Sequence, residues 1–113
     1  MKKIEAIIRP EKLEDVKTAL ANQGFAGLNT VNVVGRGIQK GVTHVGRSGE
    51  KISIDMLPKL KMEVVVRDQD AEKVVNIIIS SARTGNIGDG KIFITPIEEV
   101  IRVRTGERGE KVL

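Results

Sequence analysis

The stretch from residue 83 to residue 93 gathers the groups that most directly suggest chemistry. It reads Arg-Thr-Gly-Asn-Ile-Gly-Asp-Gly-Lys-Ile-Phe, and the spacing of Gly85 from Gly90 and Lys91 matches a Walker A phosphate-binding loop. Ile92 stands where that loop needs a Ser or Thr to ligate Mg²⁺, so the sequence predicts no Walker-type NTPase. What remains is a glycine-rich turn of backbone N–H groups beside a lysine, which favours anion binding.

Two further groups have the chemistry to join such a site. Arg102 and Arg104 are two residues apart, so an extended chain would present both guanidinium groups on one face as a fork for phosphate oxygens. The Gly35-Arg36-Gly37 turn is the second group. Taken alone, the arginines are explained more simply as a solvated strand face. Together with the turn at 88–91, the three features are consistent with a polyphosphate site.

The hydrophobic pattern predicts the elements that must position these groups. Alternation and β-type composition predict strands over residues 3–9, 28–34, 59–67 and 91–95. Apolar residues at helical spacing predict one helix from Pro10 to Gly24 and another, capped by Asp68 and Asp70, that ends at Gly85. We therefore expect an α+β fold, a ferredoxin-like double βαβ (βαββαβ) sandwich with two helices on one face of a four-stranded sheet.

A long segment from Arg36 to about Asp55 contains four glycines and has no sustained period. Connections in small domains are commonly ~4–6 residues long, so this one is expected to be functional, with a plain disordered insertion as the alternative. Its histidine, His44, is expected to be exposed to solvent. The chain has no other His, no Cys and no carboxylate pair at acid–base spacing, so an enzyme is weakly supported.

Composition limits the other possibilities. The 113 residues suit one domain, and neither a membrane span nor a signal-peptide core is found, so we expect a cytoplasmic protein. A net charge of +4 favours anionic partners, and an RNA-binding module of the same βαββαβ layout is a rival interpretation. The aromatic residues are Phe25 and Phe93 alone, which form no platform for stacking bases, so no nucleic-acid partner is expected.

Three stretches resemble a known family. They are residues 1–10 (Met-Lys-Lys-Ile-Glu-Ala-Ile-Ile-Arg-Pro), 84–93 (Thr-Gly-Asn-Ile-Gly-Asp-Gly-Lys-Ile-Phe) and 101–107 (Ile-Arg-Val-Arg-Thr-Gly-Glu). Over essentially its whole length the chain resembles the PII nitrogen-regulatory signal-transduction proteins. The resemblance implies a homotrimer of ferredoxin-like subunits, each one domain over 1–113, with a protruding T-loop at about 37–55 and a C-terminal tail at about 96–113.

The resemblance also implies ligands and partners. ATP or ADP would bind in the clefts between subunits, 2-oxoglutarate would be sensed together with Mg-ATP, and the protein would dock onto ammonium channels, enzymes or regulators. Position by position, the implied nucleotide contacts are Ile7, Gly35, Gly37, Ile38, Gln39, Glu63, Val65, Gly88, Asp89, Gly90, Lys91, Arg102 and Arg104. In this set Ile7, Glu63 and Val65 would border adenine and ribose, and the two arginines would come from the neighbouring subunit.

The remaining implied contacts concern the effector, the metal and the partner. The 2-oxoglutarate contacts would be Arg9, Gln39, Lys40, Gly41 and Lys59. Gln39 would also reach the Mg²⁺, and Arg47 matches the T-loop residue that plugs the ammonium channel.

The chain departs from the family at the sites of covalent modification. Lys51 stands where many bacterial members carry the tyrosine that is uridylylated, and the chain has no Tyr; Gly49 stands where cyanobacterial members carry a phosphorylated serine. We expect a non-enzymatic regulator of an ammonium channel that meets the membrane only indirectly, through the channel. Regulation of nitrogenase or another nitrogen-assimilation enzyme is the alternative within the family, and a basic RNA-binding module is the alternative outside it.

Overall fold

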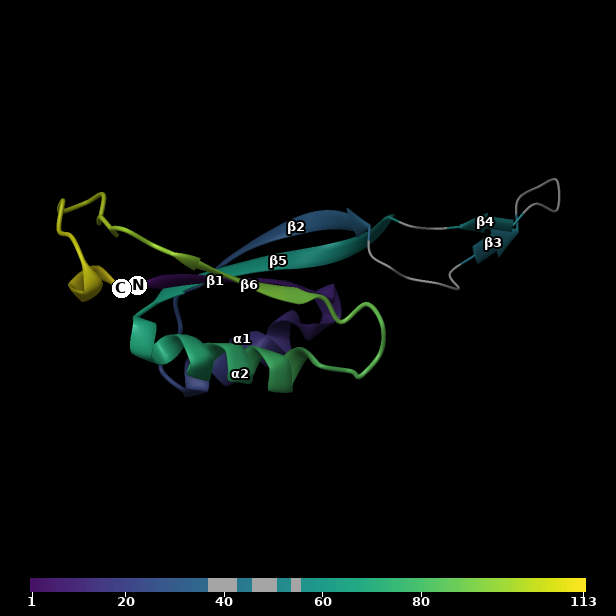
Figure 1. Ribbon diagram of the computed structural model, residues 1–113, viewed down its shortest axis with the longest axis horizontal. Coiled ribbons are helices and arrows are strands. Elements are labelled where there is room, and N and C mark those ends of the chain that lie inside the picture. The colour runs from purple at the N-terminus through teal and green to yellow at the C-terminus, as the bar shows by residue number, and fades with distance from the viewer. Residues whose placement is uncertain (37–42, 46–50, 54–55) are drawn as a thin grey trace.

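The computed structural model describes residues 1–36, 43–45, 51–53 and 56–113, with the backbone alone at 43–45 and 51–53 (Figure 1). Its main elements follow the chain in this order: β1 (Lys2–Ile8), α1 (Leu13–Asn22), β2 (Asn29–Arg36), β3 (Thr43–Val45), β4 (Lys51–Ser53), β5 (Met56–Val66), α2 (Ala71–Ala82) and β6 (Lys91–Pro96). Short 3₁₀ turns precede both helices and lie near the C-terminus, at Pro10–Lys12, Asp68–Asp70 and Glu110–Val112.

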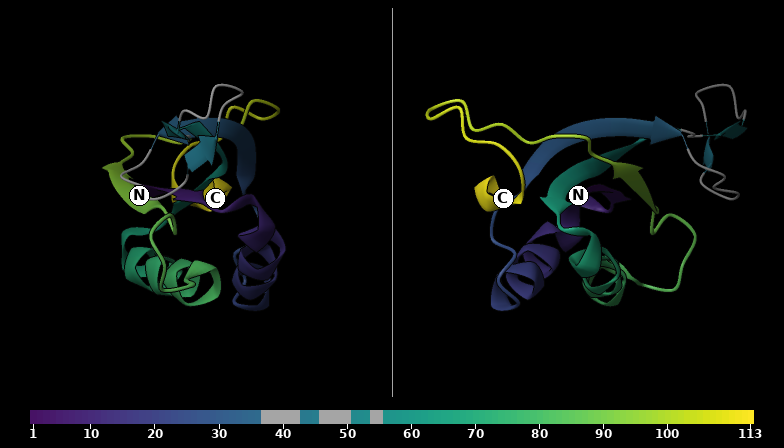
Figure 2. Two further views of the ribbon diagram at one scale, coloured as in Figure 1. Left: turned by 90° about the vertical axis from the view of Figure 1, so that its right-hand side faces the viewer. Right: turned by 60° about the vertical axis from the view of Figure 1, so that its left-hand side comes forward.

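Four strands form one antiparallel sheet in the order β2-β5-β1-β6. Both helices lie side by side on one face of this sheet, and no helix of the described residues lies against the other face (Figures 1 and 2). This arrangement confirms the predicted ferredoxin-like βαββαβ class. In the described part of the chain, no helix is long and apolar enough to cross a membrane.

The core lies between the sheet and the helices. Alternate residues of the two central strands point into it, and helical spacing turns one stripe of each helix toward it. Its fully buried larger side chains are Ile4, Leu20, Met62, Ile78, Val16 and Val74. Burying such a side chain contributes about 1.5–3 kcal/mol relative to leaving it exposed, so the central strands are fixed in position by their alternation.

The helix ends differ from the prediction. Asp70 stands at the N-cap of α2 but makes no side-chain capping bond, and the Asp68 carboxylate lies 3.0 Å from the amino nitrogen of Met1. The predicted capping was therefore wrong, because a 3₁₀ turn leads into the helix and a distant charge takes up Asp68. The prediction that α2 ends at Gly85 was also wrong, since Arg83 is already extended at φ −67 and ψ 131.

The sheet extends further toward the 37–55 segment than the sequence suggested. β2 continues to Arg36 and β5 already begins at Met56, and these two residues pair with each other. Within the segment, β3 and β4 pair as a separate two-stranded sheet, although the sequence has no sustained period there. The segment therefore leaves the body from the paired ends of two strands (Figure 1).

The C-terminal tail does not run as an extended strand through the two arginines. Ile101 bridges Arg108, and the Gly106 amide donates a 2.8 Å hydrogen bond to the Arg102 carbonyl, so the chain turns over residues 103–105. The extended conformation on which the arginine fork depended is therefore absent, because Gly106, at φ +71, lets the chain reverse there. The tail lies at the end of the molecule opposite β3 and β4 (Figure 1).

Candidate functional site

The glycine-rich turn joins the end of α2 to the start of β6. A Walker loop runs from a strand into a helix, whereas this turn runs from a helix into a strand, as the sequence indicated. Gly90 is the tightest point: its φ is +100, and a Cβ there would lie 1.6 Å from the carbonyl oxygen of Ile7. The turn is therefore pressed against the end of β1, where no side chain at position 90 would fit.

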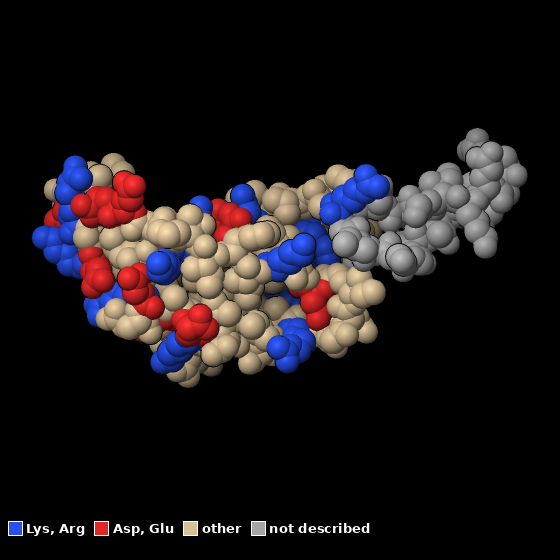
Figure 3. Space-filling view, in the orientation of Figure 1, with Lys and Arg blue, Asp and Glu red and all other residues tan. Residues whose placement is uncertain are grey.

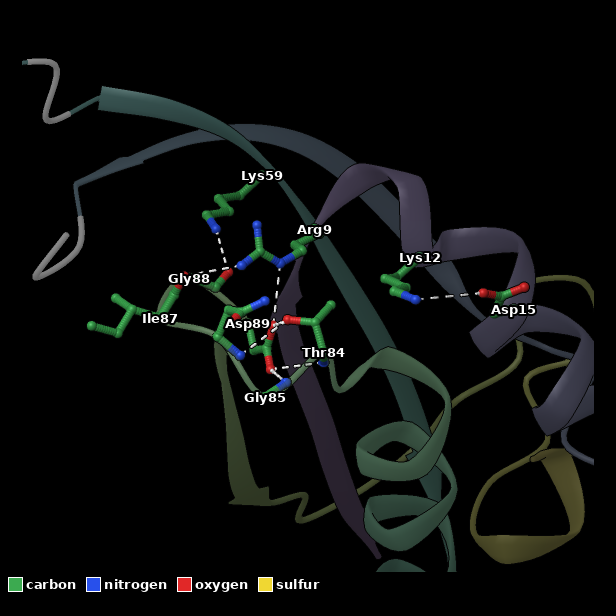
Figure 4. A network of polar contacts seen from close by, with 10 residues as sticks. Arg9, Lys12, Asp15, Lys59, Thr84, Gly85, Ile87, Gly88 and Asp89 are labelled. Carbon is green, nitrogen blue, oxygen red and sulfur yellow. Dashed lines mark hydrogen bonds and ion pairs between the residues drawn. The ribbon is translucent and has the colours of Figure 1, made fainter. Parts of the chain in front are cut away.

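The carboxylate of Asp89 closes the turn from within (Figure 4). Its Oδ2 accepts hydrogen bonds of 2.9 Å from the backbone N–H groups of Thr84 and Gly85. Its Oδ1 accepts the Thr84 hydroxyl and, at 3.2 Å, Nε of Arg9. A carboxylate has about four lone-pair positions, so these donors occupy all of its capacity.

These contacts also fix the charge of Asp89. The hydrogen bond from the Thr84 hydroxyl is the main reason that the pKa of this carboxyl lies well below the ordinary aspartate value. The backbone N–H groups of Thr84 and Gly85 and the Arg9 guanidinium lower the pKa further, and partial desolvation, which raises it, does not offset them. Asp89 is therefore an anion at any pH near neutrality.

Two cations hold the outer part of the turn by its carbonyl groups (Figure 4). Nη2 of Arg9 donates to the Ile87 carbonyl at 3.0 Å, and Nζ of Lys59 donates to the Gly88 carbonyl at 2.5 Å. The chain has no cis peptide bond among its described residues, and in a trans peptide C=O and N–H point in opposite directions. The N–H groups of Gly88 and Asp89 therefore point away from Arg9 and Lys59.

The same end of the molecule holds the end of β2. Val33 pairs with Lys59, and a Cβ at Gly35 would lie 3.7 Å from Cγ of Lys59. Lys59 thus links β2, β5 and the turn. Of the sequence-predicted residues, the structure brings together Arg9, Gly35, Lys59 and the turn residues Gly88, Asp89, Gly90 and Lys91.

Three predicted nucleotide contacts lie on the open face of the sheet. Ile7, Glu63 and Val65 alternate with the buried residues of β1 and β5, so they face away from the helices. Along β1, Ile7 pairs with both Lys61 and Lys91, and Val65 pairs with Lys3. Ile7 and Val65 are thus four positions apart, or about 13 Å at ~3.3 Å per residue.

Glu63 takes part in a charge cluster on this open face. It lies directly opposite Glu5 across the strand pair, where two like charges repel. Nζ of Lys61 lies 3.9 Å from Glu63 and 4.0 Å from Glu5, so it offsets much of that repulsion.

Basic side chains gather at the end of the body nearest β3 and β4, while acidic and basic side chains mix at the opposite end (Figure 3).

The remaining predicted residues are not brought to this end. Arg102 and Arg104 lie in the tail, and Nη1 of Arg102 pairs with Glu107 at 2.8 Å. Within one chain, the polyphosphate site suggested by all three sequence features therefore does not form. Six predicted residues lie outside the described part of the chain: Gly37, Ile38, Gln39, Lys40, Gly41 and Arg47.

A hollow lies on the helix side of the turn. This cavity of about 310 Å³ is bordered by α2, by the ends of β1 and β6, and by the turn itself at Asp89 and Gly90. Its lining is mostly apolar, with Ile8, Val75 and Ile79 among its residues, so it does not suit a polyphosphate. Anion chemistry belongs to the turn itself and to the open face.

Sequence reasoning missed Thr84. The Gly-Asp-Gly-Lys run drew attention to the turn's centre, but Thr84 supplies both a hydroxyl and an N–H group to Asp89. The available signal was weak: Thr and Asp are residues whose side chains bond nearby backbone in turns, and they flank this one five positions apart.

Comparison with known proteins agrees with this architecture. The family model described as nitrogen regulatory protein P-II matches residues 1–107. The chain is 55% identical to nitrogen regulatory protein P-II 2 of Methanothermobacter thermautotrophicus over 113 residues, all of this chain and 97% of the relative. It is 53% identical to nitrogen regulatory protein P-II of Nostoc punctiforme over 113 residues, with both chains fully covered. It is 54% identical to nitrogen regulatory protein P-II of Cereibacter sphaeroides over 110 residues, 97% of each chain. A family match over nearly the whole chain, together with relatives above half identity, shows that this chain belongs to the nitrogen regulatory protein P-II family.

Proposed function

We propose that the chain is a non-enzymatic regulator that binds ATP or ADP and 2-oxoglutarate in the clefts of a homotrimer and controls an ammonium channel through the T-loop, residues 37–55. The observation that carries the proposal is the position of the glycine-rich turn. It lies beside Arg9 and Lys59, and Lys59 in turn lies beside the end of β2, from which the T-loop leaves the body. A ligand on the turn is thus well placed to influence that loop.

The residues of the open sheet face favour a nucleotide that binds in an extended conformation. Lys91 and the turn N–H groups suit phosphates, and Ile7 and Val65 supply apolar surface further along the sheet. The separation of about 13 Å between Ile7 and Val65 suits a nucleotide that lies along the strands better than a compact ligand. Glu63 lies between them along the sheet, since its partner Glu5 stands between Lys3 and Ile7 on β1. Its carboxylate provides an acceptor for ribose hydroxyls.

The described residues fit Mg²⁺ only in part. The turn's own carboxylate, Asp89, already accepts four donors, so it has no position left for a metal. Mg²⁺ commonly keeps phosphate and water ligands and few protein ones. In the proposal the metal is therefore held by the nucleotide phosphates and by Gln39, which lies outside the described residues.

Arg9 and Lys59 support recognition of a dicarboxylate. Arg9 has five N–H donors and Lys59 has three, and the contacts with the turn use two and one of these among the described residues. Both side chains thus keep donors for the carboxylates of 2-oxoglutarate. With Gln39, Lys40 and Gly41, they form the proposed effector site.

The uncovered face of the sheet supports self-association. Its residues Val31 and Phe93 are 54% and 48% exposed, and half-buried apolar residues lie between the charged ones. A sheet with one bare, partly apolar face gains free energy when that face is covered. In a homotrimer the tail of a neighbour would also bring Arg102 and Arg104 to the turn, which one chain cannot do alone.

Titration calorimetry tests the ligands. With Mg-ATP present, 2-oxoglutarate should bind, and glutarate, which has both carboxylates but no keto oxygen, should bind much more weakly. Without Mg-ATP, the proposal expects no measurable binding of 2-oxoglutarate. Equal affinity for both diacids, or no binding of ATP at all, would contradict the proposed sites.

Affinity capture tests the partner. Channel recovered from solubilised membranes without effectors should be lost when Mg-ATP and 2-oxoglutarate are added, and Arg47→Ala should reduce the recovery seen without effectors. Capture of a nitrogenase component and no channel would favour the alternative within the family. RNA affinity that ATP does not displace would favour the RNA-binding module. Against that module, Phe25 packs beside the core on the helix side and Phe93 lies on the open face, so the two rings cannot form one stacking surface.

A further inference from the structure

Thr84 belongs to the turn but is not among the proposed phosphate contacts. It follows the end of α2 by two positions and is exposed, so it has no packing role in the core. Its hydrogen bonds all lie within the turn. Its hydroxyl donates to Asp89 and accepts a 3.2 Å hydrogen bond from the Asn86 amide, and its own N–H donates to Asp89 at 2.9 Å.

These bonds close residues 84–89 into a ring through one side chain. Within the ring, Gly88 has φ +106, a conformation that costs an unsupported chain part of its freedom. The carboxylate end of the ring is tied to Arg9, which directly follows β1, and the carbonyl of Gly88 is tied to β5 through Lys59. The turn is thus closed by its own bonds and held at these two points without any ligand.

The direction of the backbone follows from this arrangement. Because the Ile87 and Gly88 carbonyls are held toward Arg9 and Lys59, the following N–H groups point the other way. When a loop already presents its N–H groups, binding of an anion costs less free energy for ordering the loop. The Asp89 side chain cannot itself hold a phosphate, because both are anions and its acceptor positions are filled.

We propose that Thr84 is a positioning residue for phosphate binding, which acts by fixing the Asp89 carboxylate and through it the conformation of residues 84–90. The inference rests on the proposed nucleotide site. It adds that the side chain of Asp89 serves the turn rather than the ligand, and that a threonine outside the phosphate-contacting run sets the affinity for phosphates.

Isothermal titration of ATP and ADP into Thr84→Val and Thr84→Ser tests the proposal. Valine keeps the shape and removes the hydroxyl, so ATP affinity should fall about tenfold, as expected for one lost hydrogen bond to a charged group. Serine keeps the hydroxyl, so its affinity should stay within about twofold of the unaltered protein. Asp89→Asn places an amide against the same donors and should weaken ATP at least as much as Thr84→Val does.

Adenosine provides the readout that simple damage would not match. It lacks phosphates, so its affinity, measured by NMR titration, should be the same for Thr84→Val and for the unaltered protein. Equal ATP affinity in the valine variant, or an equal loss for ATP and adenosine, would overturn the proposal. If the unaltered protein itself fails to bind ATP, the proposed function fails first. Should the valine variant not fold, Asp89→Asn and Thr84→Ser carry the same comparison.

Discussion

At the scale of single residues, one carboxylate organises the turn. Asp89 accepts four donors and remains charged because those donors hold its pKa below the ordinary value. A carboxyl whose pKa is lowered by folding stabilises the folded state above its unfolded pKa and loses that contribution as pH falls through the folded one. The acid limb of the stability curve therefore reports on this residue.

The pH prediction compares the unaltered protein with Asp89→Asn. Near pH 7 the unaltered protein should have the higher urea midpoint, because asparagine cannot accept all four donors. As pH falls below about 4, where unfolded aspartate begins to protonate, the difference should shrink progressively. Urea unfolding over a pH series measures it. A difference that stays constant down to pH 2 would show that Asp89 charge is not the cause.

A second residue-scale prediction concerns the arginine that one subunit would lend to another. Arg102→Ala should weaken ATP binding by up to ~3 kcal/mol, the cost of a lost charged hydrogen bond. Arg108→Ala removes the same charge from the same tail hairpin and serves as the matched control, with affinity close to that of the unaltered protein. Calorimetry that gives both variants the same ATP affinity would count against the proposed site.

At the scale of elements, the turn depends on glycines for two different reasons. Gly85 and Gly90 both have positive φ, at +90 and +100, but only Gly90 faces backbone where a Cβ would be. The comparison between them separates backbone strain from steric overlap. Position 85 has nothing within 4 Å, so an added methyl group meets strain alone.

Alanine substitutions at these two glycines should differ in cost. Gly85→Ala should lower the free energy of unfolding by about 1–2 kcal/mol, the cost of a left-handed L-residue. Gly90→Ala should lower it by roughly 2–5 kcal/mol, because the methyl group also displaces the end of β1. Chemical denaturation measures both. Equal losses would mean that the end of β1 yields without cost.

Much of the element order was predictable from local patterns. The alternation of Leu60, Met62, Val64 and Val66 predicts β5 because one buried face requires period two, and the stripe of α2 follows in the same way. What local patterns missed depends on distant contacts. Asp68 binds the amino group of Met1 instead of capping a helix, and Asp89 binds Arg9 eighty positions away.

The site, like the elements, was predictable where local sequence was enough. Glycines and a lysine in one run indicate anion binding without any fold, and resemblance supplied the remaining candidates. The role of Thr84 was not predictable, because it arises only once the turn is closed. The conformation of the tail was not predictable, because a turn at Gly106 replaces the extended chain on which the arginine fork depended.

At the scale of the whole molecule, the main feature is the open face of the sheet, which has no layer of described residues packed against it (Figures 1 and 2). Phe93 on this face pairs with Glu5, which in turn pairs with Glu63. A charge added at position 93 would therefore enter a row that already holds two carboxylates. In a homotrimer this row would be shielded from solvent. Like charges repel more strongly in such a buried interface than in water, because the effective dielectric constant is lower there.

Analytical ultracentrifugation tests this surface. The unaltered chain should sediment with three times the mass of one chain. Phe93→Glu should shift that equilibrium toward smaller species, because it adds a third negative charge to the row. Asn76→Glu, on an exposed position of α2, adds the same charge to the other side of the molecule and should leave the mass unchanged. A trimer that tolerates Phe93→Glu equally well would place the interface elsewhere.

The length of β5 has a consequence for how a signal could travel. The strand runs unbroken from Met56, at the root of the T-loop, to Val66 beneath the core. A slip of one residue would turn all four of its buried side chains to the open face, so the register of β5 with its neighbouring strands is fixed. Under the proposed function, a rearrangement of the T-loop is therefore not expected to travel along β5. Lys59 instead offers a lateral route, because its side chain reaches from β5 to the turn.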